Sequence, residues 1–232
     1  MNQRTIFITG TSRGIGKFLA EYYLKKDYTV VGVSRSETSI KHERYHHFTA
    51  DISDEKSLMN IVLELEKNKI DPDILINNAG LSTMSPFILT ATETFENVFK
   101  VNVLGTFLVT REIAKFMIKK RWGRIINISS IASPLKLEGE SAYASSKSAV
   151  ETLTKILAKE LAPLGITCNC VGPALVPTDM LQSFPEKVIN EVKQKLAIKK
   201  VGTPDEVAYV IDFFIGEKGD CISGQTIYLG GI

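Results

Sequence analysis

Stretches of aliphatic and β-branched residues alternate with amphipathic helical stretches along the whole chain, and this alternation constrains the fold most. Several strand-like stretches, such as 5–9 and 29–33, are apolar with almost no polar alternation, which is typical of strands buried on both faces. Strands that alternate with helices predict a parallel sheet that is covered by helices on both sides. The sequence therefore predicts an α/β fold with one doubly wound sheet.

Turn residues and helix caps divide the chain into elements, with no linker or repeat between them. The expected strands are 5–9, 29–33, 73–76, 124–128, 165–171 and 225–229. The expected helices are 14–26, a helix that Ser53 caps, 92–120, 141–162 and a helix that begins with the capping box Thr203-Pro204-Asp205-Glu206. We therefore expect a single domain over residues 1–232.

The composition excludes several classes of protein. With 28 Lys plus Arg against 26 Asp plus Glu, the net charge of +2 provides no basic excess for binding nucleic acid. No apolar run reaches the roughly 18 residues of a membrane span, and the first apolar run is too short for a signal peptide. The three cysteines, an odd number, favour a reducing compartment. We therefore expect a cytoplasmic protein that binds neither nucleic acid nor membrane.

A glycine-rich loop separates the first strand from the first helix. Gly10, Gly14 and Gly16 follow the strand in a G-x-x-x-G-x-G pattern, with Ser12 and Arg13 inside the loop. Glycine lets the backbone approach a pyrophosphate closely, and a helix N-terminus offers free N–H donors with a partial positive charge. The pattern at a strand–helix junction therefore predicts a dinucleotide-binding site.

The end of the second strand bears on which dinucleotide binds. An NAD enzyme usually places a carboxylate there for the ribose 2′-hydroxyl, whereas this chain has Ser34 followed by Arg35. Arg35 and Arg13 can clamp a 2′-phosphate through charge-assisted hydrogen bonds. The sequence thus favours NADPH or NADP+ over NAD, and the alternative is that both arginines are simply solvated.

Several motifs, in order and with characteristic spacing, give the chain its resemblance to the short-chain dehydrogenase/reductase family over nearly its whole length. These motifs are Thr9-Gly10-x-x-x-Gly14-x-Gly16, Asp51-Ile52, Asn77-Asn78-Ala79-Gly80 and the tetrad Asn102, Ser130, Tyr143 and Lys147. Within the family the chain looks most similar to the 3-oxoacyl-carrier-protein reductases, on the stretches 202–208 and 223–226.

The resemblance implies a fold, an assembly and a set of site residues. The implied fold is a single Rossmann-type domain with a mostly parallel seven-stranded sheet, whose third strand precedes Asp51, and the implied assembly is a homotetramer. The catalytic residues would be Asn102, Ser130, Tyr143 and Lys147. The cofactor would contact Gly10, Ser12, Arg13, Gly14, Ile15, Gly16, Ser34, Arg35, Asp51, Ile52, Asn78, Ala79, Gly80, Tyr143, Lys147, Pro173 and Thr178.

The Tyr143-x-x-x-Lys147 spacing has a direct chemical meaning. Residues four apart lie on one face of a helix, so the ammonium lies near the phenol. A nearby cation stabilises phenolate and lowers the pKa of the phenol, which makes Tyr143 a usable general acid or base. Ser130 would hydrogen-bond the substrate oxygen where charge develops. By resemblance, Lys147 would also hold the nicotinamide ribose and Asn102 a water for proton relay.

Two alternatives to this site exist within the sequence itself. Tyr22 and Lys26 have the same spacing, but they lie at the far end of the first helix from its glycine loop, so we interpret them as helix surface. Ser129 is adjacent to Ser130, and we favour Ser130 as the substrate-binding hydroxyl.

The segment after the sixth strand departs from the family pattern. Ala174 stands where a glycine is usual, and a positive φ there would strain an alanine. The substrate loop, about 179–200, follows and carries Met180, Leu181, Phe184, Val188 and Leu196, which favours an apolar substrate modestly.

The favoured function is NADPH-dependent reduction of a ketone to a secondary alcohol, with a small-molecule or thioester-linked carbonyl, such as a 3-oxoacyl thioester, as substrate. The alternatives are a sugar, polyol or other secondary-alcohol dehydrogenase and, from another class, a non-catalytic NADP(H)-sensing protein. A basic cluster at 115–124 is either a solvated helix end or a docking site for an acidic acyl carrier protein.

We expect no metal site, because Cys168 and Cys170 lack a second ligand pair and the three histidines fit an edge or solvated position.

Overall fold

In the computed structural model, residues 4–178, 181 and 186–232 are described, and they form a seven-stranded sheet in the order β3-β2-β1-β4-β5-β6-β7. All neighbouring strands pair in parallel. The strands are β1 (Thr5–Thr9), β2 (Thr29–Ser34), β3 (Tyr45–Thr49), β4 (Ile74–Asn77), β5 (Gly123–Ile128), β6 (Ile166–Gly172) and β7 (Thr226–Tyr228). The predicted doubly wound Rossmann-type sheet is confirmed, and its strand order reverses between β1 and β4.

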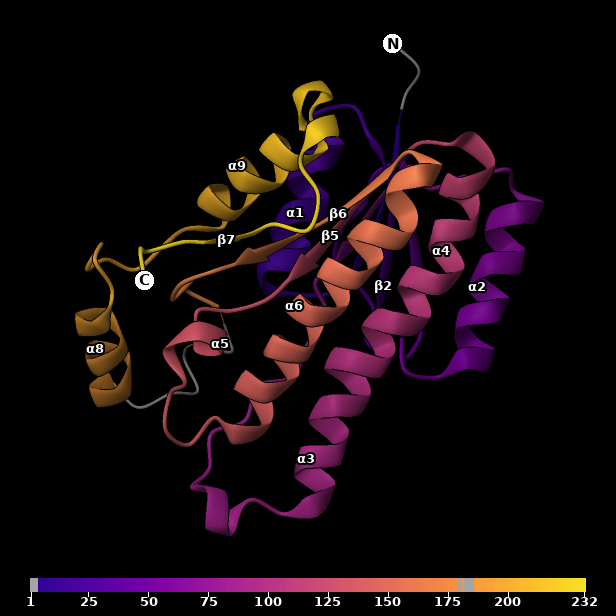
Figure 1. Ribbon diagram of the computed structural model, residues 1–232. Coiled ribbons are helices and arrows are strands. Elements are labelled where there is room, and N and C mark those ends of the chain that lie inside the picture. The colour runs from indigo at the N-terminus through magenta and orange to yellow at the C-terminus, as the bar shows by residue number, and fades with distance from the viewer. Residues whose placement is uncertain (1–3, 179–180, 182–185) are drawn as a thin grey trace.

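Helices cover both faces of the sheet. Figure 1 shows α2 (Glu55–Lys67), α4 (Thr106–Lys120) and α6 (Ser141–Leu161) on one side, with α1 (Gly14–Lys25) and α9 (Pro204–Ile215) on the other. Three shorter helices, α3 (Thr92–Phe99), α5 (Ala132–Leu135) and α8 (Glu186–Lys195), lie at one end of the molecule. None of the helices in the described ranges is long and apolar enough to span a membrane.

The alternation of side chains along each strand divides the core into two layers. Ile6 and Ile8 pack with Leu19 of α1, whereas Phe7 between them packs on the opposite face with Leu58 of α2. Successive side chains of a strand point to opposite faces, so a parallel strand covered on both sides is apolar at most positions. This explains why the buried strands read as continuous apolar runs in the sequence.

The region predicted as one helix over 92–120 is helical throughout, with a π-helical turn in the middle. This turn, Lys100–Gly105, joins α3 to α4 and contains Asn102. A π turn inserts one extra residue into the helical ladder and is frequent at functional sites. The periodicity of the sequence predicted the helix but not this local widening.

The helix caps give one correction and one confirmation. Asp54, not Ser53, caps α2, because the Asp54 carboxylate accepts a hydrogen bond from the backbone N–H of Ser57 at 3.1 Å. The Ser53 hydroxyl instead donates to the Asp51 carboxylate at 2.7 Å. The predicted capping box at the start of α9 is present, with reciprocal hydrogen bonds between Thr203 and Glu206.

The second Tyr-x-x-x-Lys pair has a structural role. The hydroxyls of Tyr22 and Tyr23 donate to the two oxygens of Asp212 on α9, at 2.6 and 3.2 Å, and the Lys26 ammonium lies 2.5 Å from Asp212. These contacts join the C-terminal end of α1 to α9. Tyr22 and Lys26 therefore stabilise the contact between α1 and α9, at the opposite end of α1 from the glycine loop.

Candidate active site

A cleft of about 710 Å³ opens at the carboxyl ends of the strands, where the chain leaves β1, β2, β4, β5 and β6. Its volume lies within the usual range for ligand sites. The predicted site residues that line it are Gly10, Ser12, Arg13, Gly14, Ile15, Ser34, Arg35, Asp51, Ile52, Asn78, Ala79, Gly80, Ser130, Tyr143, Lys147, Pro173 and Thr178. Gly16 and Asn102 lie just behind the lining, so the fold brings the predicted residues together.

The glycine loop is shaped for a close-lying ligand. Gly10 and Gly14 have φ values of +78° and +58°, which favour glycine. A Cβ on Gly16 would lie 2.2 Å from the Gly10 carbonyl oxygen, so only glycine lets α1 approach the loop this closely. Arg13 at the N-cap of α1 supplies no side-chain cap, which leaves the first N–H groups of the helix to bind an anion.

Polar side chains fasten the end of β1 to the end of β4. The Thr9 hydroxyl accepts hydrogen bonds from the backbone N–H groups of Asn78 and Ala79, each at 3.0 Å, and the Asn78 amide donates to the Thr9 carbonyl at 2.9 Å. This network fixes the floor of the cleft where the strand order reverses.

The far end of the cleft from Tyr143 is bordered by two arginines and two carboxylates. Arg13 and Arg35 are exposed there, and within the described residues neither forms a salt bridge. Glu37 lines this end, and its carboxylate accepts a hydrogen bond from the Thr49 hydroxyl at 2.9 Å. Asp51 also lines the cleft, and the nearby charge of Arg35 helps to lower its pKa.

Tyr143 and Ser130 meet at the other end of the cleft. Tyr143 stands in the first turn of α6 and lines the cleft with Ser130, whose side chain is near enough to lower the pKa of the phenol by hydrogen bonding. Burial raises the pKa of Tyr143 to about 12, which outweighs the lowering effect of the bond to Ser130. Ser129, the alternative hydroxyl, donates instead to the Glu151 carboxylate.

Lys147 lies one helical turn after Tyr143 and is buried. Its ammonium donates to the Ile128 carbonyl at 2.7 Å and lies 5.8 Å from the centroid of the Tyr143 ring. Burial lowers the pKa of Lys147 to about 8, so most molecules keep this charge at pH 7. The expected lowering of the pKa of Tyr143 by Lys147 is not found in this structure, because burial of the phenol dominates.

Asn102 supports the site from the π-helical turn. Its side-chain oxygen accepts from the backbone N–H of Leu81 at 2.8 Å, and its amide donates to the Leu81 carbonyl and the Ser146 hydroxyl, each at 2.9 Å. Asn102 thus ties the irregular segment at Leu81, which follows β4, to the helix that carries Tyr143 and Lys147.

A buried glutamate near Tyr143 escaped the sequence analysis. Glu140 immediately precedes α6, lines the cleft, and is only 6% exposed. Burial raises the pKa of Glu140 to about 7. The signal available in the sequence was its position three residues before the tyrosine of the motif, which places both residues at the start of one helix.

The segment after β6 shapes the substrate side of the cleft. Ala174 is not among the described non-glycine residues with positive φ, so the strain that its substitution for glycine suggested does not arise. Part of the predicted substrate loop is helical, and Leu181, Val188, Ile189 and Val192 line the cleft. Met180 and Phe184, also predicted for this loop, lie outside the described residues.

The basic cluster at 115–124 is neutralised within the protein. Lys115, Lys119 and Lys120 form salt bridges with Glu112, Glu66 and Asp73. Arg124 pairs with Asp220, and Arg121 donates to the Pro163 carbonyl. These cations are therefore engaged by their own chain.

The described cysteines and histidines do not gather into a metal-binding group. Cys168 and Cys170 are buried on β6, Cys221 is exposed, and all three are free thiols. Among the described residues, no group of three or more His, Cys, Asp or Glu side chains is placed to hold a metal ion.

Comparison with known proteins gives concordant matches. Residues 4–189 match the family described as short chain dehydrogenase. The chain is 35% identical to a 3-oxoacyl-[acyl-carrier-protein] reductase of Aquifex aeolicus, over 97% of this chain and 94% of the relative. A 4-hydroxyisoleucine dehydrogenase complexed with NADH superposes with a TM-score of 0.90 at 27% identity, over 99% of this chain and 98% of the other. ElxO with NADP bound superposes with a TM-score of 0.89 at 32% identity, over 98% of this chain and 97% of the other.

Replacing Glu140 by glutamine should change how stability depends on pH. The pKa of this carboxyl rises from 4.5 to about 7 on folding, so the folded state binds its proton more tightly and loses stability as pH rises from about 4.5 to 7. Glu140→Gln removes this loss, and we expect it to stabilise the protein by about 1–3 kcal/mol at pH 8 and little at pH 4.5. Urea unfolding at both pH values measures the difference; equal effects at the two values would contradict the burial of an ionisable carboxyl.

Proposed function

Since the chain belongs to the short chain dehydrogenase family, we propose that it reduces a ketone to a secondary alcohol with NADPH as the hydride donor. Members of this family are oxidoreductases that act on CH–OH and C=O groups with NAD(P), and this chain is one of them. The observation that carries the proposal is the convergence of Ser130, Tyr143 and Lys147 at one end of the cleft that begins at the glycine loop.

The geometry supports a proton transfer from Tyr143 to the carbonyl oxygen. The bound nicotinamide would supply the hydride that reduces the carbonyl carbon. A carbonyl oxygen between the Ser130 and Tyr143 hydroxyls would accept a hydrogen bond from each, so these donors stabilise the negative charge that develops on it. Tyr143 then donates its proton to this oxygen as a general acid.

Lys147 and Asn102 assist this proton transfer by positioning groups and stabilising charge. A dinucleotide that follows the cleft brings its nicotinamide ribose toward the Lys147 ammonium, which can donate to the ribose hydroxyls. The charge of Lys147 favours the phenolate that remains after proton transfer. Asn102 keeps the Gly80–Leu81 segment against α6, and we propose that it also helps to hold a water for proton return to Lys147.

Replacing Tyr143 by phenylalanine tests the mechanism, because it removes only the hydroxyl. We expect kcat for ketone reduction to fall by about 100-fold or more, which is the usual contribution of a general acid. The Kd for NADPH, measured by fluorescence titration, should change little. Retained turnover would contradict the role of Tyr143, and a wild-type protein that binds NADPH but reduces no ketone in a broad panel would indicate a non-catalytic sensor.

The preference for NADPH over NADH rests on Arg13 and Arg35. Both guanidiniums are free of salt bridges within the described residues and stand at the adenosine end of the cleft, where a 2′-phosphate would pair with them. Glu37 opposes this effect with one negative charge at the same end. Asp51 adds a second carboxylate near Arg35, so the preference rests on the two guanidiniums reaching the phosphate and not on the net charge of this end.

Arg35→Ala should therefore weaken selectivity for NADPH. We expect KM for NADPH to rise about tenfold, the effect of losing one charge-assisted contact to phosphate, while KM for NADH changes less. Steady-state kinetics with both cofactors measures the ratio. Lys25→Ala removes the same charge from the exposed end of α1 outside the cleft and serves as control. An unchanged ratio for Arg35→Ala would show that this arginine is merely solvated.

For the substrate, we propose a 3-oxoacyl thioester. The apolar side chains of Leu181, Val188, Ile189 and Val192 form a wall suited to an acyl chain rather than to a sugar. The relative from Aquifex aeolicus, which is described as a 3-oxoacyl-[acyl-carrier-protein] reductase, agrees with this choice. An acyl carrier protein gains no support from the basic cluster at 115–124, because its members already pair with groups of this chain.

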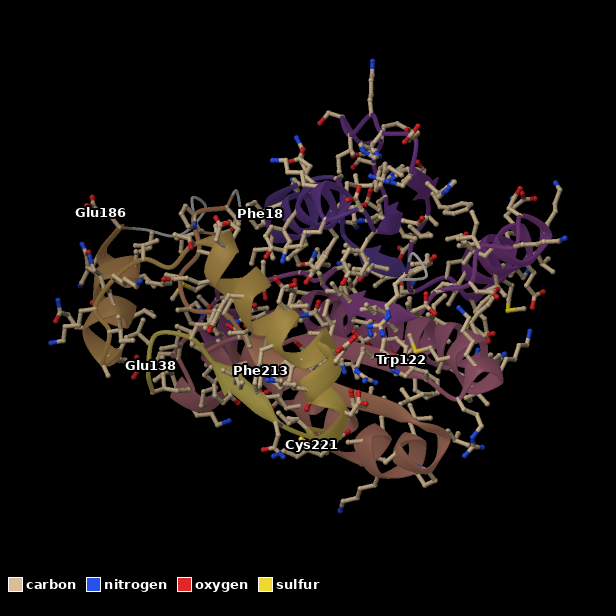
Figure 2. The ribbon with its side chains drawn as sticks, turned by 90° about the horizontal axis from the view of Figure 1, so that it is seen from above. Phe18, Trp122, Glu138, Glu186, Phe213 and Cys221 are labelled. Carbon is tan, nitrogen blue, oxygen red and sulfur yellow. The ribbon has the colours of Figure 1, made fainter. Side chains whose placement is uncertain are left out.

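We also propose a cytoplasmic homotetramer. Phe95, Leu104 and Phe107 are exposed on the surface of α3, the π-helical turn and α4, and Ile156 is exposed on α6. A second apolar surface lies on α9, where Figure 2 shows Phe213. Exposed apolar patches of this kind mark interaction sites. Light scattering should give four times the chain mass of 25.7 kDa, and a monomer would contradict the proposal.

A further inference from the structure

The cleft contains one carboxyl group that the proposed mechanism leaves unused. Glu140 is 6% exposed, and its Oε2 atom is buried with no hydrogen-bond partner among the residues that the structure describes. Glu140 is also the N-cap residue of α6, yet its side chain makes no cap hydrogen bond to that helix. A buried polar atom without a partner is costly, so its persistence in a ligand cleft points to a partner that arrives with the ligand.

The surroundings of Glu140 favour its neutral form. Burial alone raises its pKa to about 7, and no positive charge in the described chain counters this effect. Its own loop carries Lys136, which donates to the Ser133 carbonyl, and Glu138, and both are exposed. On α6 it faces Tyr143, whose pKa is raised further by the charge of Glu140. Lys147 is bound to the Ile128 carbonyl.

Among the residues that the structure describes, the part of α8 that lines the cleft adds no charge near this carboxyl. The residues of α8 that line the cleft are Val188, Ile189 and Val192, all apolar. A neutral carboxylic acid carries one O–H donor in addition to its acceptor oxygens. With a pKa of about 7, Glu140 presents the cleft with a hydrogen-bond donor in the molecules that keep its proton, and their fraction grows as pH falls.

We propose that Glu140 donates a hydrogen bond, as a neutral carboxylic acid, to a second carbonyl oxygen of the substrate. This inference rests on the proposed reduction of a 3-oxoacyl thioester and specifies how the site recognises it. In such a substrate one methylene group separates the ketone from the thioester carbonyl, so the two oxygens lie close together. Tyr143 and Glu140 are three residues apart at the start of one helix and line the same cleft, which suits them to bind one oxygen each.

This assignment distinguishes Glu140 from a polyol-binding carboxylate. A carboxylate that accepts from a substrate hydroxyl would act best when ionised, so its contribution would grow with pH. A carboxylic acid that donates to a carbonyl acts only when protonated, so its contribution falls as pH rises. The direction of the pH dependence therefore separates the two chemistries.

The test compares two matched substrates with NADPH. One is the acetoacetyl thioester of N-acetylcysteamine, and the other is the same ketone with the thioester carbonyl replaced by a methylene group. The ratio of their kcat/KM values cancels the titration of Tyr143 and Lys147, which serve both substrates. We expect this ratio to fall about tenfold or more between pH 6 and pH 8.5 in the wild-type protein. Over this range Glu140 loses the proton that it would donate to the thioester carbonyl.

Two substitutions at Glu140 sharpen the test. Glu140→Gln keeps an N–H donor at every pH, so its ratio should stay high and lose the pH dependence. Glu140→Leu has no donor, and its ratio should be about 10- to 100-fold below that of the wild type at pH 6. Glu138→Gln changes the exposed glutamate two residues earlier and should behave as the wild type.

The outcomes separate this inference from the proposed function. If neither ketone is reduced, the proposed function fails. If both are reduced with a ratio that neither pH nor Glu140→Leu changes, the proposed function stands and the role of Glu140 is wrong. A ratio that rises with pH, together with a preference for hydroxylated ketones, would overturn the donor role and assign Glu140 to a polyol substrate.

Discussion

The close approach of α1, the end of β1 and the end of β4 is the constraint on which the site depends. Gly16 lies so near the Gly10 carbonyl and the Asn78 amide that a single added Cβ would clash with both. Thr9 and Asn78 then join the two strand ends by hydrogen bonds at the point where the strand order reverses. The helix N-terminus, the cleft floor and the loop that carries Gly80 are placed together by this contact.

Burial sets the pKa values of three residues of the site. It raises the pKa values of Tyr143 and Glu140 and lowers that of Lys147, so each group is shifted toward its neutral form, while Lys147 with a pKa of about 8 stays mostly charged at pH 7. A site of this kind strengthens hydrogen bonds to a reacting carbonyl, because few water molecules compete and the effective dielectric constant is low. The same low dielectric makes any unpartnered polar group costly, and the buried Oε2 of Glu140 is such a group in the cleft.

The identical spacing of two tyrosine–lysine pairs shows how position in the fold decides chemistry. Tyr22 and Lys26 bind Asp212 on the neighbouring helix α9 and so contribute to packing. Tyr143 and Lys147 lie in the first turns of α6, at the carboxyl edge of the sheet, and so line the same cleft as Ser130 and the glycine loop. A tyrosine–lysine pair with this spacing thus forms part of a candidate active site only where the topology places it beside the other site residues.

The sequence by itself determined the sheet, its helical layers and the predicted residues that line the cleft, because periodicity, glycine spacing and polar residues at strand ends are local properties. The tertiary structure decided the rest. It placed the cap of α2 on Asp54, widened the helix at Asn102 into a π turn and paired Lys119, Lys120 and Arg124 of the basic cluster with acidic residues distant in sequence. It also decided the burial of Tyr143 and Glu140, and hence their pKa values. Burial and long-range pairing depend on segments that meet only after folding, and no local pattern encodes them.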